Sequence, residues 1–370
     1  MIIHRKLHKS TLLLIGIASV AIWVLAQNVL REDEWYRYKK KAAETMLVAE
    51  RVLVARVKGH KIHKPERVLA KKEIFDSEAF RKKAQSVLLG RRRESPVKTT
   101  AGLLEAKRAV TDSSFAEVVV GMFRRAGLKE GDTIAVAFTG SFPGANIAVL
   151  SAAKTMGLKP VIISSIGASQ WGATSLDLTW IDMERILFEE GVFPFRSTAA
   201  SLGGRRDVQA SKSEEDVKKM KEVVRKNGLP LIYERNLKDN VESRMAIYAT
   251  RAEGKPIKAF VNVGSGIAVL GRYGYRDRFQ EGVIFELPQE EFKSRGVMVS
   301  MLDKGIPVVN IRNIDRVLLE KELEDSETGV FSGRIKQVII SIVSLIALIG
   351  VILVLTILDL KGYMAADKRE

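Results

Sequence analysis

The sequence contains no cysteine. Disulfide bonds, thiolate nucleophiles and cysteine-ligated metals are therefore excluded together. The absence does not decide the cellular compartment, because many exported proteins also lack disulfides.

Histidine is scarce, and none lies in the central stretch 111–334; the residues present are His4, His8, His60 and His63. A Ser-His-Asp site or a histidine-ligated metal in that stretch would need a histidine from elsewhere in the chain. His60 and His63 could share a helical face, but Lys61 and Lys64 surround them, which favours a solvated basic face over a metal pair. We expect no metal and no cofactor.

Charged residues are absent from two long apolar runs, 10–30 and 337–358. Each run is long enough to cross a hydrocarbon core of about 30 Å as a helix, which satisfies its own backbone polar groups there. The first run could alternatively be a cleaved signal peptide, and the second a buried core helix. The sequence predicts two transmembrane helices, with short tails at 1–9 and 359–370.

The charges beside these runs bear on orientation. The first tail carries Arg5, Lys6 and Lys9, which favours a cytoplasmic start, whereas basic residues just past the first run pull the other way. Short charged tails normally stay inside. We therefore expect a two-pass cell-membrane protein with both termini cytoplasmic and the large domain extracytoplasmic.

The net charge of +16 is concentrated near the first apolar run. Residues 31–110 hold 22 Lys and Arg against 11 Asp and Glu. This basic region reads as helical, with an apolar stripe at helical spacing formed by Ala42, Met46, Ala49, Leu53 and Val57. It is either a solvated helical stalk or a basic surface that meets lipid headgroups, a polyanion or an acidic protein.

From about residue 111, apolar strand-like runs alternate with helical segments. The expected strands are 133–138, 160–166, 192–199, 229–234, 257–264 and 306–311. Such alternation favours a mainly parallel sheet covered by helices on both faces. The predicted fold class is a Rossmann-like α/β domain over 111–334, in which 271–296 is a loop-rich insertion or a short β ribbon.

The loop after the first expected strand reads TGSFPGAN and lacks several known signatures. A Walker loop needs a Lys-Ser/Thr pair that does not follow Gly144, and a dinucleotide fingerprint needs three spaced glycines. The G-x-S-x-G nucleophile turn places its serine between two glycines, whereas Ser141 adjoins Gly140. A serine–lysine pair of Ser141 with Lys154 stays open, because the sequence does not place these side chains.

The same loop does offer backbone N–H groups at the start of a helix, where an anion can bind. Ser141 is a candidate cap for that helix, and Pro143 suits its first turn. A second strand-to-helix junction, NVGSGIAVLG at 262–271, has the same features, and SIGASQWGATSLDLTW follows a third strand. A capped turn that binds nothing is the alternative for each junction.

Carboxyl ends of parallel strands share one edge of a sheet, where ligands gather. The sequence therefore predicts a pocket for a carboxylate or similar anion. Its candidate residues are Thr139, Gly140, Ser141, Gly144, Asn146, Ser169, Gln170, Asn262, Gly264, Ser265 and Gly266. Trp171, Asp177 and Asp182 are further candidates in the third loop, although Trp171 equally suits the core.

Two stretches, IAVAFTGSFPGANIAVLSAAKTMGLKPVIISSIGASQWGAT and AFVNVGSGIAVLG, resemble the poly-γ-glutamate system protein family. The resemblance runs through the whole chain, both apolar runs included. It implies an accessory part in making or exporting this capsule polymer, beside a membrane-associated ligase. It implies no catalytic residues.

The partners implied are poly-γ-glutamate or its synthase and export proteins, together with the lipid bilayer. We expect no nucleic-acid partner, and a homo-oligomer stays open. Three function classes remain: an accessory polymer-binding subunit, a γ-glutamyl hydrolase or transferase, and a general membrane assembly scaffold.

Overall fold

The computed structural model describes residues 17, 34–57, 59, 78–90 and 95–318, with ten further positions between 341 and 357. Residues Arg37–Leu323 form one compact unit, and Met1–Tyr36 with Glu324–Glu370 form another. The predicted boundary at residue 110 falls inside the first of these units and so does not separate two compact units.

The described parts of the chain hold no helix that is both long enough and apolar enough to span a membrane. Of the predicted span 10–30 only Ile17 is described, and 337–358 is described at ten positions. The tails 1–9 and 359–370 lie outside the described residues, as do His60 and His63. The two transmembrane helices therefore stay predictions.

Seven strands form one sheet, in the order β4-β3-β2-β1-β5-β7-β6. Every neighbouring pair is parallel except β6 with β7. The strands are β1 Thr133–Thr139, β2 Lys159–Ser165, β3 Ser197–Ser201, β4 Leu231–Ile232, β5 Ile257–Val263, β6 Gly282–Ile284 and β7 Val308–Ile311. The predicted Rossmann-like, mostly parallel sheet is confirmed, and its antiparallel strand β6 lies in the stretch 271–296.

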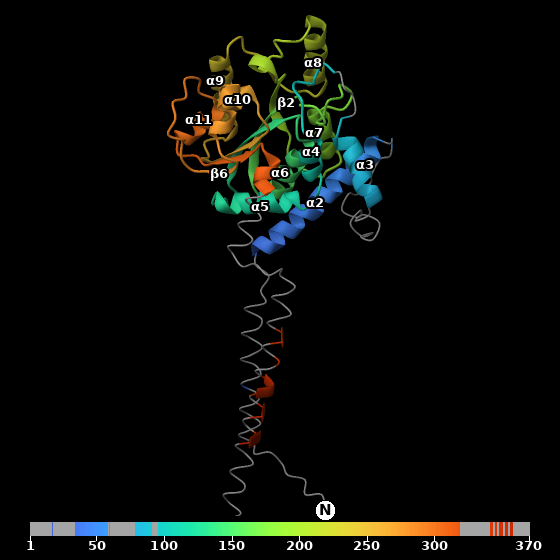
Figure 1. Cartoon of the computed structure of the whole chain (residues 1–370), viewed down its shortest axis with the longest axis vertical. Helices are drawn as coiled ribbons and strands as arrows, with labels where there is room; N and C mark the ends of the chain where they lie inside the picture. The colour runs from blue at the N-terminus through green and yellow to red at the C-terminus, as the bar shows by residue number, and fades with distance from the viewer. Residues whose placement is uncertain are drawn as a thin grey trace, which may run out of the picture. The chain divides into compact units, whose positions relative to one another are not determined.

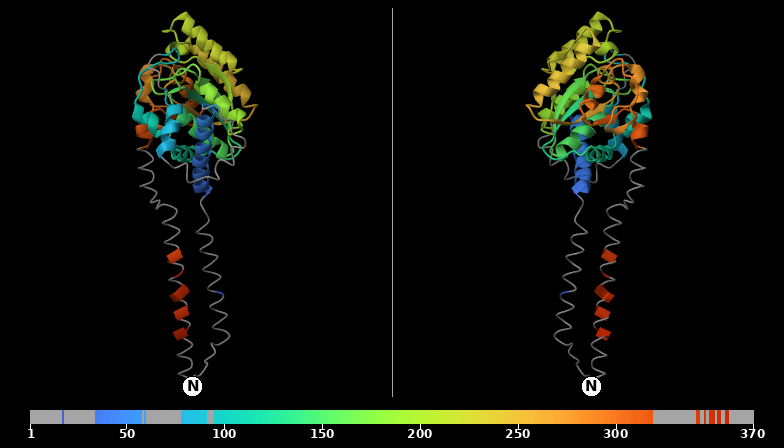
Figure 2. Two further views of the ribbon diagram at one scale, coloured as in Figure 1. Left: turned by 90° about the vertical axis from the view of Figure 1, so that its right-hand side faces the viewer. Right: turned by 90° about the vertical axis from the view of Figure 1, so that its left-hand side faces the viewer.

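Helices cover both faces of this sheet (Figures 1 and 2). The group α9, α10 and α11 lies on one face and α5, α6 and α7 on the other. The elements are α4 Leu104–Ala109, α5 Phe115–Arg125, α6 Pro143–Thr155, α7 Trp180–Glu189, α8 Glu214–Lys226, α9 Leu237–Arg251, α10 Ile267–Leu270 and α11 Val297–Leu302, with short 3₁₀ turns η3 Arg205–Asp207 and η4 Tyr273–Arg278.

The central strand β1 is buried along its whole length, as expected for a strand with helices on both faces. Ala135 and Ala137 pack in one apolar cluster with Tyr248 of α9. Phe138, which faces the other way, makes an edge-to-face contact with Trp180 of α7 at 5.5 Å between ring centroids. Alternate side chains of β1 therefore pack against two separate layers of helices.

The charged helix α8 shows how local sequence sets helix ends. The Ser213 hydroxyl accepts a hydrogen bond from the Asp216 N–H at 3.1 Å, which caps the first turn. Acidic residues fill that turn, and Arg225 and Lys226 fill the last, as the helix dipole favours. Gly228 follows the helix at a φ of +67°, the left-handed conformation that commonly ends a helix.

The expected strands 192–199 and 229–234 are shorter in the structure. Strand β3 begins at Ser197 and not at residue 192, because the N–H groups of Val192 and Phe193 both donate to Leu187 O and close the end of α7. The helix after β5 is only four residues long. It stops at Gly271, where φ is +86° and an added Cβ would lie 2.2 Å from Ser294 O.

Two further helices precede the sheet: α2 Glu34–Val57 and α3 Glu78–Leu88. The predicted stripe on α2 is a packing face, since Ala42, Met46, Ala49 and Leu53 are fully buried; Val57 at its end is exposed. Basic side chains at the start of α2 are exposed, namely Arg37, Lys40 and Lys41.

Candidate functional site

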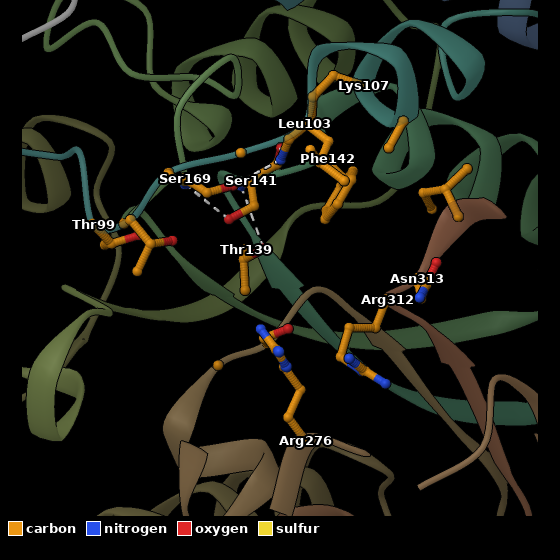
Figure 3. A pocket seen from close by; sticks show the side chains of 18 of the residues that line it. Thr99, Leu103, Lys107, Thr139, Ser141, Phe142, Ser169, Arg276, Arg312 and Asn313 are labelled. Atoms are coloured by element: carbon orange, nitrogen blue, oxygen red, sulfur yellow. Dashed lines mark hydrogen bonds between the residues drawn. The ribbon is translucent and has the colours of Figure 1, made fainter. Parts of the chain in front are cut away.

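A cavity of about 540 Å³ opens at the carboxyl edge of the sheet (Figure 3). Its floor is the end of β1 beside β5, where Ser141 and Phe142 follow β1, and Ser265 and Gly266 follow β5. The chain runs from β1 outward through β2, β3 and β4, and then returns to β5 on the other side of β1. This reversal is the topological switch point at which open α/β sheets bind ligands.

The lining of this cavity is rich in hydroxyl groups and in charge. The hydroxyl side chains are Thr99, Thr100, Thr139, Ser141, Ser165, Ser169, Ser265 and Tyr273. The charged residues are Lys107, Arg276, Asp277, Arg312 and Asp315. Such a surface suits a polar, anionic ligand with several hydrogen-bond acceptors.

Lys107 of α4 is the most enclosed of these charged residues, with 2% of its surface exposed. Its Nζ donates to the backbone oxygen of Ser141 and, at 2.7 Å, to Ser169 Oγ. It also lies 3.5 Å from the centroid of the Phe142 ring. Burial lowers the pKa of this amine to about 7, so charged and neutral forms coexist near neutral pH.

Two glycines bring the Lys107 helix and its preceding loop against the sheet edge. A Cβ added to Gly144 would lie 2.3 Å from Val110 O, and one added to Gly102 would lie 2.4 Å from Gln170 O. The predicted site residue Gly144 therefore acts by allowing close approach of α6 to the end of α4. Its role is in packing, and it does not line the cavity.

Ser141 is placed differently from the expectation that it caps the next helix. The N-cap of α6 is Phe142, without a side-chain cap, and Pro143 lies in the first turn as expected. The Ser141 hydroxyl instead accepts a hydrogen bond from the Ser169 N–H at 3.0 Å. The capping role was wrong because Pro143 begins the helix one residue too late for Ser141 to reach it.

Thr139 and Gly264 join the loops after β1 and β5. The Thr139 hydroxyl donates to Val263 O at 3.2 Å and accepts from the Ser141 N–H at 3.3 Å. Gly264 has a φ of +99°, and a Cβ there would lie 2.3 Å from Thr139 Oγ1. A side chain at residue 264 would therefore separate the two loops that form the cavity floor.

The side-chain amides of two buried asparagines, Asn146 and Asn262, hold the same loops in place. Asn146 Nδ2 donates to Thr139 O at 2.9 Å. Asn262 Nδ2 donates to Gly264 O at 2.9 Å and to Asn310 Oδ1 at 2.8 Å. These side chains shape the strand ends without lining the cavity.

The structure thus divides the predicted site residues into two groups. Those that line the cavity are Thr139, Ser141, Ser169, Ser265 and Gly266. Those that do not line it are Gly140, Gly144, Asn146, Gln170, Asn262 and Gly264. Of the second group, Asn146, Asn262 and Gly264 contact the loops that carry the first.

Other candidates from the sequence lie away from the cavity. Asp182 is buried in the capping box of α7 with Thr179 and accepts from Asn227 Nδ2 at 2.9 Å, so its role is structural. Asp177 and Trp171 do not line the cavity either. Lys154 donates to Val192 O at 2.6 Å, and the lysine near Ser141 is Lys107.

Two arginines, Arg276 and Arg312, also line the cavity, and neither was among the residues predicted from the sequence. Arg312 follows β7, is 9% exposed and pairs with Glu281 at 2.5 Å. Its Nε has no hydrogen-bond partner in the part of the chain that the structure describes. Arg276 of η4 is exposed and enters the cavity from the side opposite Lys107 (Figure 3).

Lys107 is expected to make stability depend on pH. Its folded pKa of about 7 lies below the unfolded value, so between about pH 7 and 10 the unfolded chain binds the extra proton. The free energy of unfolding therefore rises with pH in this window, by roughly 1 kcal/mol per pH unit. Denaturant unfolding of the full chain from pH 7 to 9 should show this rise, and Lys107→Met should lose it.

The matched control is Lys255→Met, which changes an exposed lysine in the turn after α9. We expect this control to keep the wild-type slope. Identical slopes for Lys107→Met and wild type would contradict the assigned state of Lys107.

Within the described residues, no group of three His, Asp or Glu side chains is placed to hold a metal ion. Compared with family models, curated proteins and solved structures, the chain has no match.

Proposed function

We propose that this chain is an accessory, membrane-anchored subunit of poly-γ-glutamate synthesis or export, and that its strand-end cavity binds carboxylates of the polymer. The observation that carries the binding proposal is the cavity at the β1–β5 switch point, with Lys107 and Arg276 on opposite sides. The choice of polymer comes from the family resemblance of the sequence.

The chemistry of the cavity fits a γ-glutamyl chain. Each residue of that polymer carries one free carboxylate and one amide, and so presents anionic oxygens alternating with neutral donors and acceptors. Lys107 and Arg276 supply charge-assisted hydrogen bonds to carboxylates. Hydroxyl groups such as those of Ser265 and Thr100 can donate to carboxylates or amide oxygens, and accept from amide N–H groups.

Two features support the membrane part of the proposal. The described positions in 337–358 are helical, and most of their large apolar side chains are exposed, among them Leu345 and Leu353. The exposed basic start of α2 follows the first apolar run by a few residues, as expected for a segment near anionic headgroups or a polyanion. With both tails cytoplasmic, the large domain lies outside, where the finished polymer accumulates.

Binding of penta-γ-glutamate to the purified full chain tests this function. We expect Lys107→Met to weaken binding about tenfold, since one charge-assisted hydrogen bond contributes about 1.5–3 kcal/mol. Lys255→Met should bind as wild type does. Penta-α-glutamate has the same charge and should bind more weakly, because its amide spacing differs.

The salt dependence of binding distinguishes the cavity from the basic surface of α2 as the binding site. Attraction to exposed charges weakens steeply as salt screens them, whereas contacts in an enclosed cavity are screened less. Preference for the γ-linked oligomer should therefore survive at high salt. Equal, salt-sensitive binding of both oligomers would contradict the cavity proposal, and recovery of the synthase without any oligomer binding would favour an assembly scaffold.

A further inference from the structure

A serine hydroxyl and a buried lysine amine face each other inside the cavity. Ser169 Oγ lies 2.7 Å from Lys107 Nζ, and both residues line the cavity. The distance is that of a nucleophile and its base in covalent catalysis. Figure 3 shows Lys107 reaching from α4 toward Ser169 and Ser141, which come from the loops after two different strands.

The surroundings of Lys107 suit a proton acceptor. The side chain is 2% exposed, and burial lowers the pKa of its amine to about 7. A neutral amine can take a proton from a hydroxyl, which an ordinary solvated lysine cannot do at neutral pH. The other charged groups that line the cavity are Arg276, Asp277, Arg312 and Asp315.

The hydroxyl group of Ser169, like the amine of Lys107, is held in position. The Ser169 N–H donates to Ser141 Oγ at 3.0 Å, which fixes the backbone that carries the hydroxyl. On either side of Ser169, the Thr99 N–H donates to Ala168 O and the Gln170 N–H to Thr100 O, each at 2.8 Å. Ser169 remains partly exposed to the cavity. A positioned and accessible hydroxyl is what an acyl-transfer nucleophile requires.

We propose that Ser169 and Lys107 form a serine–lysine acyl-transfer site that acts on an amide bond of the bound γ-glutamyl chain, with Ser141 as the positioning residue. This inference rests on the proposed function, since the cavity must first bind the chain. It adds a reaction to an otherwise accessory subunit: cleavage of the polymer, or its transfer to another amine.

The reaction follows from the two groups alone. Lys107 Nζ takes the proton from Ser169 Oγ as that oxygen bonds to the amide carbonyl carbon. The C–N bond then breaks, and the ammonium of Lys107 returns the proton to the leaving nitrogen, which leaves an ester on Ser169. Water or an acceptor amine attacks this ester and loses a proton to Lys107, after which the ester C–O bond breaks and the proton returns to Ser169 Oγ.

A fluorophosphonate probe, followed by peptide mapping of the full chain, tests the nucleophile directly. We expect one covalent adduct, on Ser169, whose rate of formation rises with pH through about 7 as Lys107 loses its proton. Ser169→Ala should abolish the adduct. Lys107→Met should slow it about 100-fold or more, since general-base catalysis contributes 10²–10⁴-fold.

Matched controls and a second readout separate catalysis from folding. Ser86→Ala, in the exposed part of α3, and Lys255→Met should react as wild type does. Cleavage of penta-γ-glutamate into shorter oligomers should depend on Ser169 and Lys107 in the same way. The mapping of the wild-type adduct needs no variant, so misfolding of a variant does not obscure it.

The inference and the proposed function fail differently. If penta-γ-glutamate binds the wild-type chain but Ser169 stays unmodified from pH 6 to 10 and no oligomer is cleaved, the acyl-transfer site is wrong and the binding site stands. An adduct on Ser141 in place of Ser169 would also overturn the assignment. If the oligomer does not bind at all, the proposed function fails first.

Discussion

Replacing Arg244 with methionine is expected to lower the free energy of unfolding by about 3–5 kcal/mol, because it leaves a buried carboxylate without its charge partner. Arg244 of α9 pairs with Asp207 at 2.6 Å, and the two side chains are 3% and 2% exposed. The guanidinium also donates to Ser201 Oγ at 2.7 Å and to Asn240 Oδ1 at 2.9 Å. Asp207 is the last residue of η3. This 3₁₀ turn begins directly after Gly204, which lines the cavity.

The expected loss of stability is large because the Arg244–Asp207 pair is buried. An exposed ion pair serves as the control. Arg225 and Glu222 of α8 form an ion pair of similar length, but their side chains are 77% and 55% exposed. Arg225→Met should therefore change the free energy of unfolding by less than about 1 kcal/mol. The double variant Arg244→Met/Asp207→Asn should recover much of the loss, since the uncompensated charge is gone. Equal effects of Arg244→Met and Arg225→Met in denaturant unfolding would contradict this account.

Gly144→Ala is expected to disturb both stability and ligand binding. The added Cβ would lie 2.3 Å from Val110 O and 2.8 Å from Val110 C, so backbone must move. Overpacking of this kind costs about 1–3 kcal/mol. The segment that moves is the end of α4, which carries Lys107. We therefore expect the affinity for penta-γ-glutamate to fall at least as far as in Lys107→Met.

Gly121→Ala in α5 is the matched control. Nothing outside its own helix lies within 4 Å of an added Cβ, and its backbone is helical. Alanine is favoured over glycine in a helix interior by about 0.5–1 kcal/mol, so this variant should be as stable as wild type or more so. Wild-type affinity in Gly144→Ala, measured by calorimetric titration, would show that close approach of α4 is not needed for the site.

The α/β part of the fold follows from local sequence because its elements are bounded by strong signals. The strand at β1 is a continuous apolar run, Pro143 begins α6, and Gly157 follows it at a φ of +66°. An apolar run predicted the wrong strand start where its first residues belong to the end of the preceding helix. Val192 closes α7 through Leu187 O, although its apolar side chain reads as the start of a strand.

The candidate site could be located from the sequence only in part. Ser141 and Ser265 follow strands, and carboxyl ends of parallel strands meet at one edge, so their convergence could be expected. Lys107 could not be distinguished from the other lysines of a basic segment, because only tertiary contacts bury it. The position of Lys107 in the cavity depends on Gly144 and Gly102, which allow close contact between segments distant in sequence.

We propose above that the cavity at the β1–β5 switch point binds the γ-glutamyl chain. An experimental structure of the full chain carrying Ser169→Ala, with penta-γ-glutamate bound, tests it most directly, because this variant also blocks any turnover of the oligomer. We expect a carboxylate of the oligomer within hydrogen-bond distance of Lys107 Nζ or Arg276, and the oligomer passing over Ser265. An oligomer ordered only on the basic start of α2, with the cavity empty, would contradict it.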